Sequence, residues 1–586
     1  MNSRKATAAL ALATALALGA SACNSSSKSD SKGSGGSHGS SAAKDAALTS
    51  IVNPSTTKGG TVNLEESDVP DSLDPGNTYY GWVQNFSRLY ARTLLTFKPA
   101  AGKDGLTVVP DLATGLGQSS PDAKTWTYHI RSGLKYDDGT PITTKDIKYA
   151  IERSNFAPEA LSNGPTYFKA YLANDTKYQG PYKDKNGLAS IETPDDTTIV
   201  FHLAKPFADF DYLATFSQTS PVPQAKDDGA GYVKHIVASG PYKFASYTDG
   251  ASASLVRNPQ WQQSTDPIRK ALPDNINIKF HVDPNKVDND LLSGNITADA
   301  LGTGVQTNTQ AKVQNPKYAK NTDDSYAGAT SYMAINPNVA PFSNPDCRKA
   351  VEYAIDKVSV QTAAGGPIKG DVATTLLPPT VNGYAKFDEY PTPGNNGDTA
   401  KAKQELTACG KPGGFSTNLS ARSDRPQEMA AATAIQNSLG KVGIKVSIKS
   451  YPSGKYFSNF AGVPTFVHQN KLGLMMTAWG ADWPTGYGFL DQIVDGSAIK
   501  PSGGNNLQEL NDPKINAALQ AAIANTDPAA RTKAWGDIDK MVVDTATVVP
   551  LLYRKNLLYR PDSATNVTVT QAYQGMYDYL LLSSSK

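Results

Sequence analysis

The chain has 586 residues, enough to bury several hydrophobic cores, and this length is typical of roughly three to four domains. The formal charge is only +2 and charged residues make up 19% of the chain, so the composition does not indicate binding to nucleic acid or to an anionic surface. The 28 tyrosines stand out, because tyrosine combines flat apolar area with a polar tip and suits recognition surfaces as well as cores.

The N-terminus has the pattern of an export signal. Arg4 and Lys5 give a basic start, an uncharged run rich in alanine and leucine follows, and small residues lead into Cys23. The apolar run is shorter than the ~20 residues that a membrane-spanning helix needs. The small residues before Cys23 resemble the lipobox of bacterial lipoproteins. This predicts a signal peptide over residues 1–22 and a lipid on Cys23, with cleavage that leaves a free Cys23 as the alternative.

A flexible tether is expected to follow the signal. Residues 24–50 are rich in serine and glycine and have no apolar periodicity, which is typical of a disordered linker. We assign residues 23–56 to this tether. A G-x-S-x-G match inside it lacks the strand and helix that a nucleophile elbow needs, so we dismiss it.

Short strand and helix patterns alternate through the rest of the chain, which favours an α/β globule. Residues 126–136 predict a strand that buries Trp126 and Tyr128 and leaves His129 facing solvent. Thr143 and Asp146 predict a capping box at the start of a helix. Later patterns predict helices over residues 427–442 and from Asp527-Pro528, each leading into a strand.

Two cysteines remain for the folded part. Cys347 lies on the apolar face of a predicted helix that starts at Asn344-Pro345 and extends to Val358. Cys409 directly precedes Gly410, which is expected to end a helix around residues 399–408. In an oxidising compartment the two cysteines could form a disulfide; two buried thiols are the alternative.

An acid lies between two tryptophans in AWGADWPTGYGFLD, residues 478–491. Trp479 and Trp483 favour burial, but an ionised Asp482 in apolar surroundings is costly unless a partner neutralises it or hydrogen-bonds to it. That partner is either inside the chain or a ligand. From residue chemistry alone, the tryptophans are interpreted as core residues and Asp482 as a loop acid.

Motifs for metal binding or catalysis are missing from the sequence. The six histidines include no pair at metal-ligand spacing, and there is no H-E-x-x-H, C-x-x-C or phosphate-binding glycine loop. We therefore expect no metal, no cofactor and no enzymatic activity. A surface-tethered hydrolase remains a distant alternative, since catalytic triads assemble from residues far apart in sequence.

Several sequence blocks, in one order, resemble the bacterial extracellular solute-binding proteins of family 5, the peptide binders of ABC importers. The most specific block is TWTYHIRSGLKYDDGTPITTKDIKYAIER. The other blocks are GGTVNLEESDVPDSLDP, VVPDLATGL, ASGPYKF with LVRNPQW, AINPNVAPFSNPDCRKAVEYAIDK and AWGADW.

The resemblance implies an α/β, two-lobed periplasmic-binding-protein-like fold with a hinge and a cleft, plus an extra domain. Lobe 1 (domain I) would combine residues 57–97, 218–320 and 547–586. Domain II would be 98–217, and lobe 2 (domain III) would be 321–546. Ligand would lie in the cleft and be enclosed as the lobes close.

The resemblance also implies which residues contact a ligand. Two segments would lay extended backbone against a peptide: Tyr79-Tyr80-Gly81-Trp82 and Ala478-Trp479-Gly480. Asp482 would accept the ligand's α-ammonium, with Trp483 as a further candidate contact. Some long-peptide binders carry an arginine for the ligand carboxylate where this chain has Met476. Recognition of a carboxylate is then left to His468, to Lys471 or to another residue, or is absent.

We therefore expect a monomeric lipoprotein that captures oligopeptides or dipeptides outside the cell, at the cell surface or in a periplasm, and delivers them to the permease subunits of an ABC importer. The lipid would anchor it to the outer face of the cell membrane. The alternative keeps the scaffold and changes the cargo to a sugar, an opine, a siderophore or a metal chelate.

Overall fold

The computed structural model describes residues 43–173 and 177–585. The predicted signal peptide, Cys23 and the tether up to residue 42 lie outside the described residues. The prediction of a tether is wrong for residues 43–56. Ala47 and Val52 are buried there, the backbone N–H of Ala47 donates to Asp323, and Val52 forms a β-bridge with Val567.

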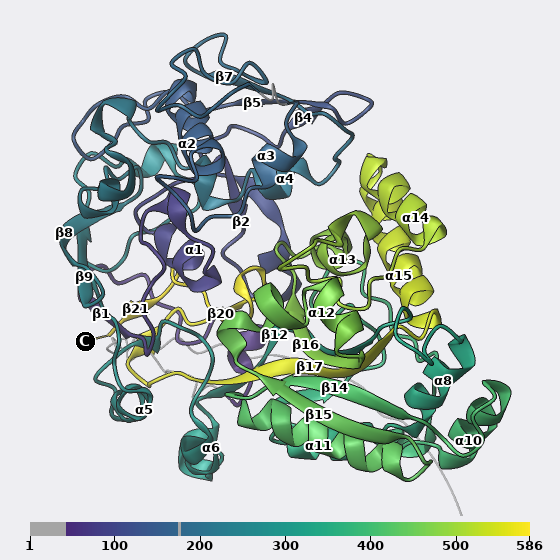
Figure 1. Cartoon of the computed structure of the whole chain (residues 1–586). Helices are drawn as coiled ribbons and strands as arrows, with labels where there is room; N and C mark the ends of the chain where they lie inside the picture. The colour runs from purple at the N-terminus through teal and green to yellow at the C-terminus, as the bar shows by residue number, and fades with distance from the viewer. Residues whose placement is uncertain (1–42, 174–176, 586) are drawn as a thin grey trace, which may run out of the picture. The chain divides into compact units, whose positions relative to one another are not determined.

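Three sheets organise the described part of the chain (Figure 1). The β1 sheet has the strand order β11 (Ala298–Asp299), β1 (Thr61–Glu65), β10 (Asn275–Lys279), β9 (Ser252–Arg257) and β8 (Tyr242–Thr248). The β5 sheet is antiparallel, with the order β4 (Gln118–Ser119), β5 (Thr125–His129), β7 (Thr198–His202) and β6 (Ile191–Glu192).

The β16 sheet is mixed and carries the site described below. Its strand order is β13 (Gly370–Val372), β17 (Val548–Tyr559), β12 (Thr322–Ile335), β16 (Leu472–Gly480), β14 (Ser416–Arg422) and β15 (Lys445–Tyr451). Because β17 pairs with β12 and β13, this sheet extends past residue 546, where we predicted lobe 2 to end.

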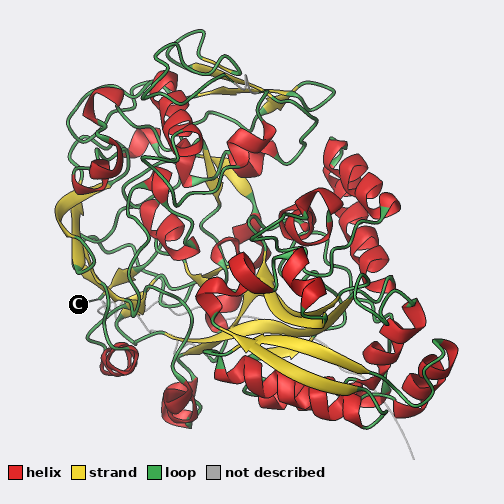
Figure 2. Ribbon diagram, in the orientation of Figure 1, coloured by secondary structure: helices red, strands yellow, loops and turns green. Residues whose placement is uncertain are grey.

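Helices fill the connections between the strands (Figure 2). Figure 1 shows α11 along one side of the β16 sheet, with α12 and α13 on the other. The helices are α1 (Gly81–Ser87), α2 (Thr144–Phe156), α3 (Tyr167–Tyr171), α4 (Phe210–Leu213), α5 (Pro284–Ser293), α6 (Thr307–Val313), α7 (Pro316–Ala319), α8 (Pro345–Ala354), α9 (Lys357–Ala363), α10 (Thr399–Ala408), α11 (Pro426–Gly440), α12 (Pro464–Gln469), α13 (Gly486–Val494), α14 (Pro513–Ala524) and α15 (Pro528–Asp544).

Short strand pairs complete the fold. They are β2 (Leu95–Phe97) with β3 (Val108–Pro110), β18 (Ala564–Thr565) with β21 (Ser583–Ser584), and β19 (Val569–Thr570) with β20 (Met576–Tyr577).

The predictions that depend on interactions between residues close in sequence, such as helix caps and strand alternation, are confirmed. The capping box of Thr143 and Asp146 opens α2, and the strand β5 buries Trp126 and Tyr128 while His129 is exposed. The helices predicted near residues 427–442 and after Asp527 are α11 and α15.

One predicted helix is wrong in its length. The apolar face that begins at Cys347 was expected to continue to Val358, but α8 ends at Ala354 and Ile355 has extended backbone angles. The side chain of Asp356 accepts a hydrogen bond from the backbone N–H of Ser359 and so caps a new helix, α9.

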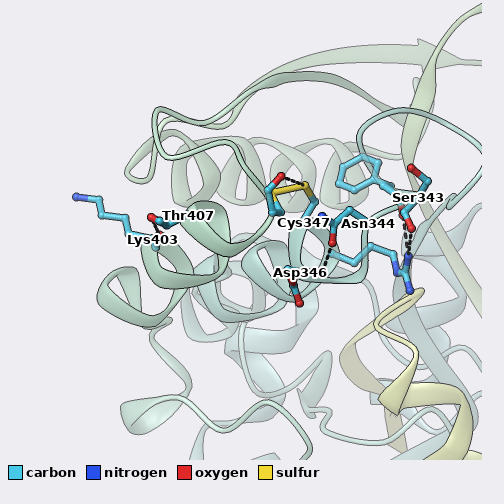
Figure 3. The surroundings of a disulfide bond; sticks show 9 residues. Ser343, Asn344, Asp346, Cys347, Lys403 and Thr407 are labelled. Atoms are coloured by element: carbon cyan, nitrogen blue, oxygen red, sulfur yellow. Dashed lines mark hydrogen bonds between the residues drawn. A yellow bond between two sulfur atoms is a disulfide. The ribbon is translucent and has the colours of Figure 1, made fainter.

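Cys347 and Cys409 form a disulfide, with Cα atoms 5.2 Å apart (Figure 3). The bond joins the first turn of α8, which Asn344 caps, to the residue that ends α10. Gly410 follows with a left-handed φ of 73°, as expected of a residue that terminates a helix.

Candidate functional site

The site is built on the C-terminal end of β16. Ala478, Trp479 and Gly480 are extended there, as predicted, and face Ser331, Thr330 and Ala329 of β12. On the opposite edge β14 pairs with β16 only as far as Met475, so the backbone of residues 477–480 has no partner strand on that side in the described part of the chain. The indole N–H of Trp479 is buried and lacks a hydrogen-bond partner among the described residues.

The loop after β16, residues 481–485, is fixed by hydrogen bonds to the core and to α13. The backbone N–H of Asp482 donates to the carbonyl of Gly488 over 3.0 Å. Asp209 accepts the indole N–H of Trp483 at 3.2 Å and the hydroxyl of Thr485 at 2.7 Å. Trp483 is only 3% exposed and packs edge-on against the ring of Tyr167. It therefore braces the loop from inside the core.

Asp482 is satisfied from within the chain. The hydroxyl of Tyr79 donates to Oδ1 of Asp482, and the hydroxyl of Tyr167 donates to Oδ2. Of the two sources of a partner considered for this acid, the chain itself or a ligand, the chain supplies two hydrogen-bond donors. The neighbouring glycines Gly486 and Gly488 are required by packing. A Cβ at either position would collide with Trp535 or Trp483, so they permit close packing of α13.

The ionisation of Asp482 is perturbed by its surroundings. Burial is the main cause that raises its pKa to about 6, and the negative charge of Asp491 adds to this effect. The hydrogen bonds from Tyr167 and Tyr79 act in the opposite direction because they favour the carboxylate. Near pH 7 the group is thus ionised, but only weakly stabilised in that form.

Tyr79 reaches the acid from the N-terminal part of the chain. Asp71 accepts hydrogen bonds from the backbone N–H of Tyr79 at 2.7 Å and from the hydroxyl of Thr78 at 2.6 Å. The side chains of Tyr79 and Tyr80 are exposed.

The expectation of an extended segment through Trp82 is wrong. Gly81 begins α1, and Trp82 in its first turn is 3% exposed and packs against Phe280.

Tyr167 was not anticipated from the sequence. It lies on the short helix α3 of a region with no site motif, and it contacts Asp482 across 315 positions of sequence. The high tyrosine content was the only available signal, and it could not single out one ring among 28.

A cavity of about 570 Å³ adjoins β16. Met476, Thr477 and Ala478 line it on the β16 side, and residues 303–307 also line it. The other walls come from β14, β17, α9 and the start of α11. Met476 itself is 3% exposed, and its carbonyl accepts the hydroxyl of Tyr456 at 3.0 Å.

His468 is not brought to this cavity. It lies in the last turn of α12, and its Nε2 lies 3.0 Å from the carboxylate of Glu509. Within the described residues, no group of three or more histidine, cysteine or acidic side chains could hold a metal ion. None of the helices described there has both the length and the apolarity to cross a membrane.

A family model and a solved structure both match this chain over most of its length. Residues 107–501 match the model of the family "Bacterial extracellular solute-binding proteins, family 5 Middle". The solved structure of "Clavulanic acid biosynthesis oligopeptide binding protein 2" is 40% identical and superposes with a TM-score of 0.89, over 93% of this chain and 99% of that one.

More distant relatives differ in their named ligands. The "Probable D,D-dipeptide-binding periplasmic protein DdpA" of Escherichia coli is 26% identical over 83% of this chain and 87% of its own length. "Heme-binding protein A" of Haemophilus influenzae is 26% identical over 88% of this chain and 90% of its own length. The fold is thus that of periplasmic binding proteins, on which different ligands are recognised.

Proposed function

This chain belongs to the bacterial extracellular solute-binding proteins of family 5, and we propose that it captures short peptides outside the cell for an ABC importer. The proposal is supported by the oligopeptide- and dipeptide-binding names of its relatives. In this role the protein binds and releases its cargo without chemical change, as a binder and not as an enzyme.

The observation that carries the proposal is the cluster formed by the carboxylate of Asp482 and the hydroxyl groups of Tyr79 and Tyr167. An ammonium group has three N–H donors. The carboxylate of Asp482 keeps free lone pairs beside its two tyrosine bonds, and the hydroxyl oxygens of Tyr79 and Tyr167 can each accept as well. A peptide amino group placed here meets one negative charge and two neutral acceptors, with aromatic rings around it.

The free edge of β16 supplies the second part of the proposed grip. Residues 477–480 leave backbone N–H and C=O groups without a strand partner in the described chain, directly before Asp482. An extended peptide could add to this edge by main-chain hydrogen bonds, which read direction and leave side-chain identity open.

Substitution Asp482→Asn tests the amine site. It keeps the shape of the side chain and removes its charge, so a free-amine tetrapeptide should lose about 10- to 100-fold in affinity by titration calorimetry, the range expected for a charge-assisted hydrogen bond. The N-acetylated form of the same peptide should change by less than about threefold. Equal losses for both peptides would remove the ammonium role.

The cellular setting completes the proposal. We propose that residues 1–22 are a signal peptide, that Cys23 carries a lipid on the outer face of the cell membrane, and that the protein acts as a monomer that docks on permease subunits. We further propose lobes that close around the cargo, with residues 57–97, 218–320 and 560–586 in lobe 1, 98–217 as domain II, and β17 joined to lobe 2 because it pairs with β12.

A non-peptide cargo is the competing proposal, since a relative is named for heme. Mass spectrometry of small molecules that co-purify with the protein separates the two. A peptide in the extract supports the function proposed here, whereas a sugar, an opine or a chelate would replace it. Incubation with peptides should return them intact, and cleavage products would indicate a hydrolase.

A further inference from the structure

The cavity beside β16 carries an excess of positive charge. Its basic lining residues are Lys369, Arg422, Arg425, Arg554 and Lys555, and Glu428 is the one acid among the described residues that line it. They come from the β13 end, β14, the start of α11 and β17, so the cluster forms only in the folded chain.

Two of these cations are neutralised by acids. Nε of Arg422 lies 2.9 Å from Oε2 of Glu428, and a second nitrogen of the same guanidinium also contacts that carboxylate. Nζ of Lys555 lies 2.8 Å from Asp371 and 3.3 Å from Asp324. Lys555 therefore faces two carboxylates, so these contacts set two cations against three acids.

The other three cations are not balanced. Lys369, Arg425 and Arg554 form no ion pair with any residue of the described chain, and the one side-chain hydrogen bond among them runs from Arg425 to the hydroxyl of Ser453. The side chains of Arg425 and Arg554 are exposed, and that of Lys369 is partly buried. Desolvation within the cavity and the charges of Arg425 and Arg422 lower the pKa of Arg554, and Glu428 acts in the opposite direction. Desolvation and the charge of Arg554 lower the pKa of Lys369, and Asp288 opposes that shift. The cations repel one another across the cavity.

Helix α11 adds to this field. Its first turn, Pro426 to Glu428, lines the cavity, and no side chain among the described residues caps its N-terminus. The unpaired backbone N–H groups of a helix start and the positive end of its dipole favour an anion. Guanidinium groups add a planar fork that matches carboxylate geometry.

We propose that this cavity is a subsite for a ligand end that bears two negative charges close together, as in a peptide with a C-terminal Glu or Asp. The five lining cations and the three carboxylates that contact them leave an excess of two positive charges, which one carboxylate does not neutralise. This inference rests on the function proposed above, because Asp482 would hold the other end of the same ligand. The cavity would also supply the contact to the ligand's carboxylate end that Met476 cannot provide.

The distance from Asp482 to the cavity limits how short the ligand can be. Ala478 lines the cavity and Asp482 follows four residues later, so at most about 14 Å separate the Cα of Asp482 from that edge of the lining. An extended peptide advances by roughly 3.4 Å per residue, so a tetrapeptide held at Asp482 is long enough to reach the cavity.

The test compares Ala-Ala-Ala-Glu with Ala-Ala-Ala-Gln by titration calorimetry. The wild-type protein should bind the glutamate peptide about tenfold or more tightly, as expected for an added charge-assisted pair. In Arg554→Gln and Lys369→Gln this preference should fall below about threefold. Lys403→Gln removes one positive charge from an exposed position of α10 that does not line the cavity, and should keep the full preference.

Each outcome separates the inference from the function on which it rests. Binding of both peptides with equal affinity would overturn the dianion subsite and leave peptide capture intact. If neither peptide binds, glutarate is titrated while thermal unfolding is followed. A rise in Tm of the wild type that Arg554→Gln abolishes supports the subsite without peptide capture, and no rise overturns it. The unliganded Tm of each variant verifies that it is folded.

Discussion

At the scale of single residues, the proposed role of Asp482 depends on the surroundings of its carboxylate. The residue is partly buried, and two neutral tyrosine donors stabilise its charge without cancelling it. An arriving ammonium would add the missing positive charge. The pKa of Asp482 is raised because its carboxylate is incompletely stabilised in the free protein, and a bound cation would supply the missing stabilisation.

This arrangement predicts a pH dependence of binding. The pKa of Asp482 is raised to about 6, and the bound ammonium requires the carboxylate, so protonation below pH 6 competes with the ligand. The Kd of a free-amine peptide should rise about tenfold per pH unit below 6 and be constant between about pH 6.5 and 7.5. Calorimetry between pH 4.5 and 7.5 measures it. An N-acetylated peptide serves as control, and an equally steep rise for that peptide would contradict this assignment.

At the scale of elements, the glycines around the site have different tasks. A Cβ on Gly480 would lie 3.5 Å from the nearest atom of the described chain, an ordinary contact. A Cβ on Gly488 would lie 2.5 Å from the carbonyl oxygen of Trp483. Gly488 is therefore required by the packing of α13 on the loop, whereas nothing inside the described chain requires Gly480.

The two glycine variants should separate folding from binding. Gly480→Ala is expected to change the free energy of unfolding by less than about 0.5 kcal/mol and to weaken peptide binding about tenfold, because the added methyl crowds the free edge of β16. Gly488→Ala should lower the free energy of unfolding by about 1–3 kcal/mol through overpacking. Urea unfolding and calorimetry measure both. Unchanged binding by folded Gly480→Ala would argue against a peptide on this edge.

At the scale of the whole molecule, the disulfide contributes to stability away from the site. Cys347 and Cys409 are separated by 62 positions, and closing such a loop restricts the unfolded chain. Neither sulfur lies on the lining of the cavity or next to Asp482. Its loss should therefore affect the free energy of unfolding without affecting ligand contacts.

Replacing both cysteines with alanine is expected to lower the free energy of unfolding by roughly 4 kcal/mol, according to the loop-closure entropy of the unfolded chain. Peptide affinity at 25 °C should stay within about twofold of the wild type, because the altered helices α8 and α10 do not contribute site residues. Denaturant unfolding and calorimetry provide the two values. Unchanged stability would contradict a structural role of the bond.

Much of the local structure could be predicted from residues that act on their near neighbours. Thr143 with Asp146, Asn344 and Gly410 each set a helix boundary within a few positions of themselves. The predicted helix length was wrong where a second capping residue interrupts a continuous apolar pattern: Asp356 caps α9 inside the pattern that begins at Cys347. The order of sequence blocks identified the family because it spans nearly the whole chain.

The sequence alone determined the family, the fold class and the position of the candidate anchor Asp482. The tertiary structure decided how that acid is satisfied, because its partners lie 403 and 315 positions away. It also decided that the cations of β14, α11 and β17 meet in one cavity. The physical reason is the sequence separation over which each interaction acts. Helix caps and apolar periodicity involve residues a few positions apart and can be read from the sequence. Desolvation and charge repulsion depend on distances in space between residues far apart in sequence, and no sequence pattern records those distances.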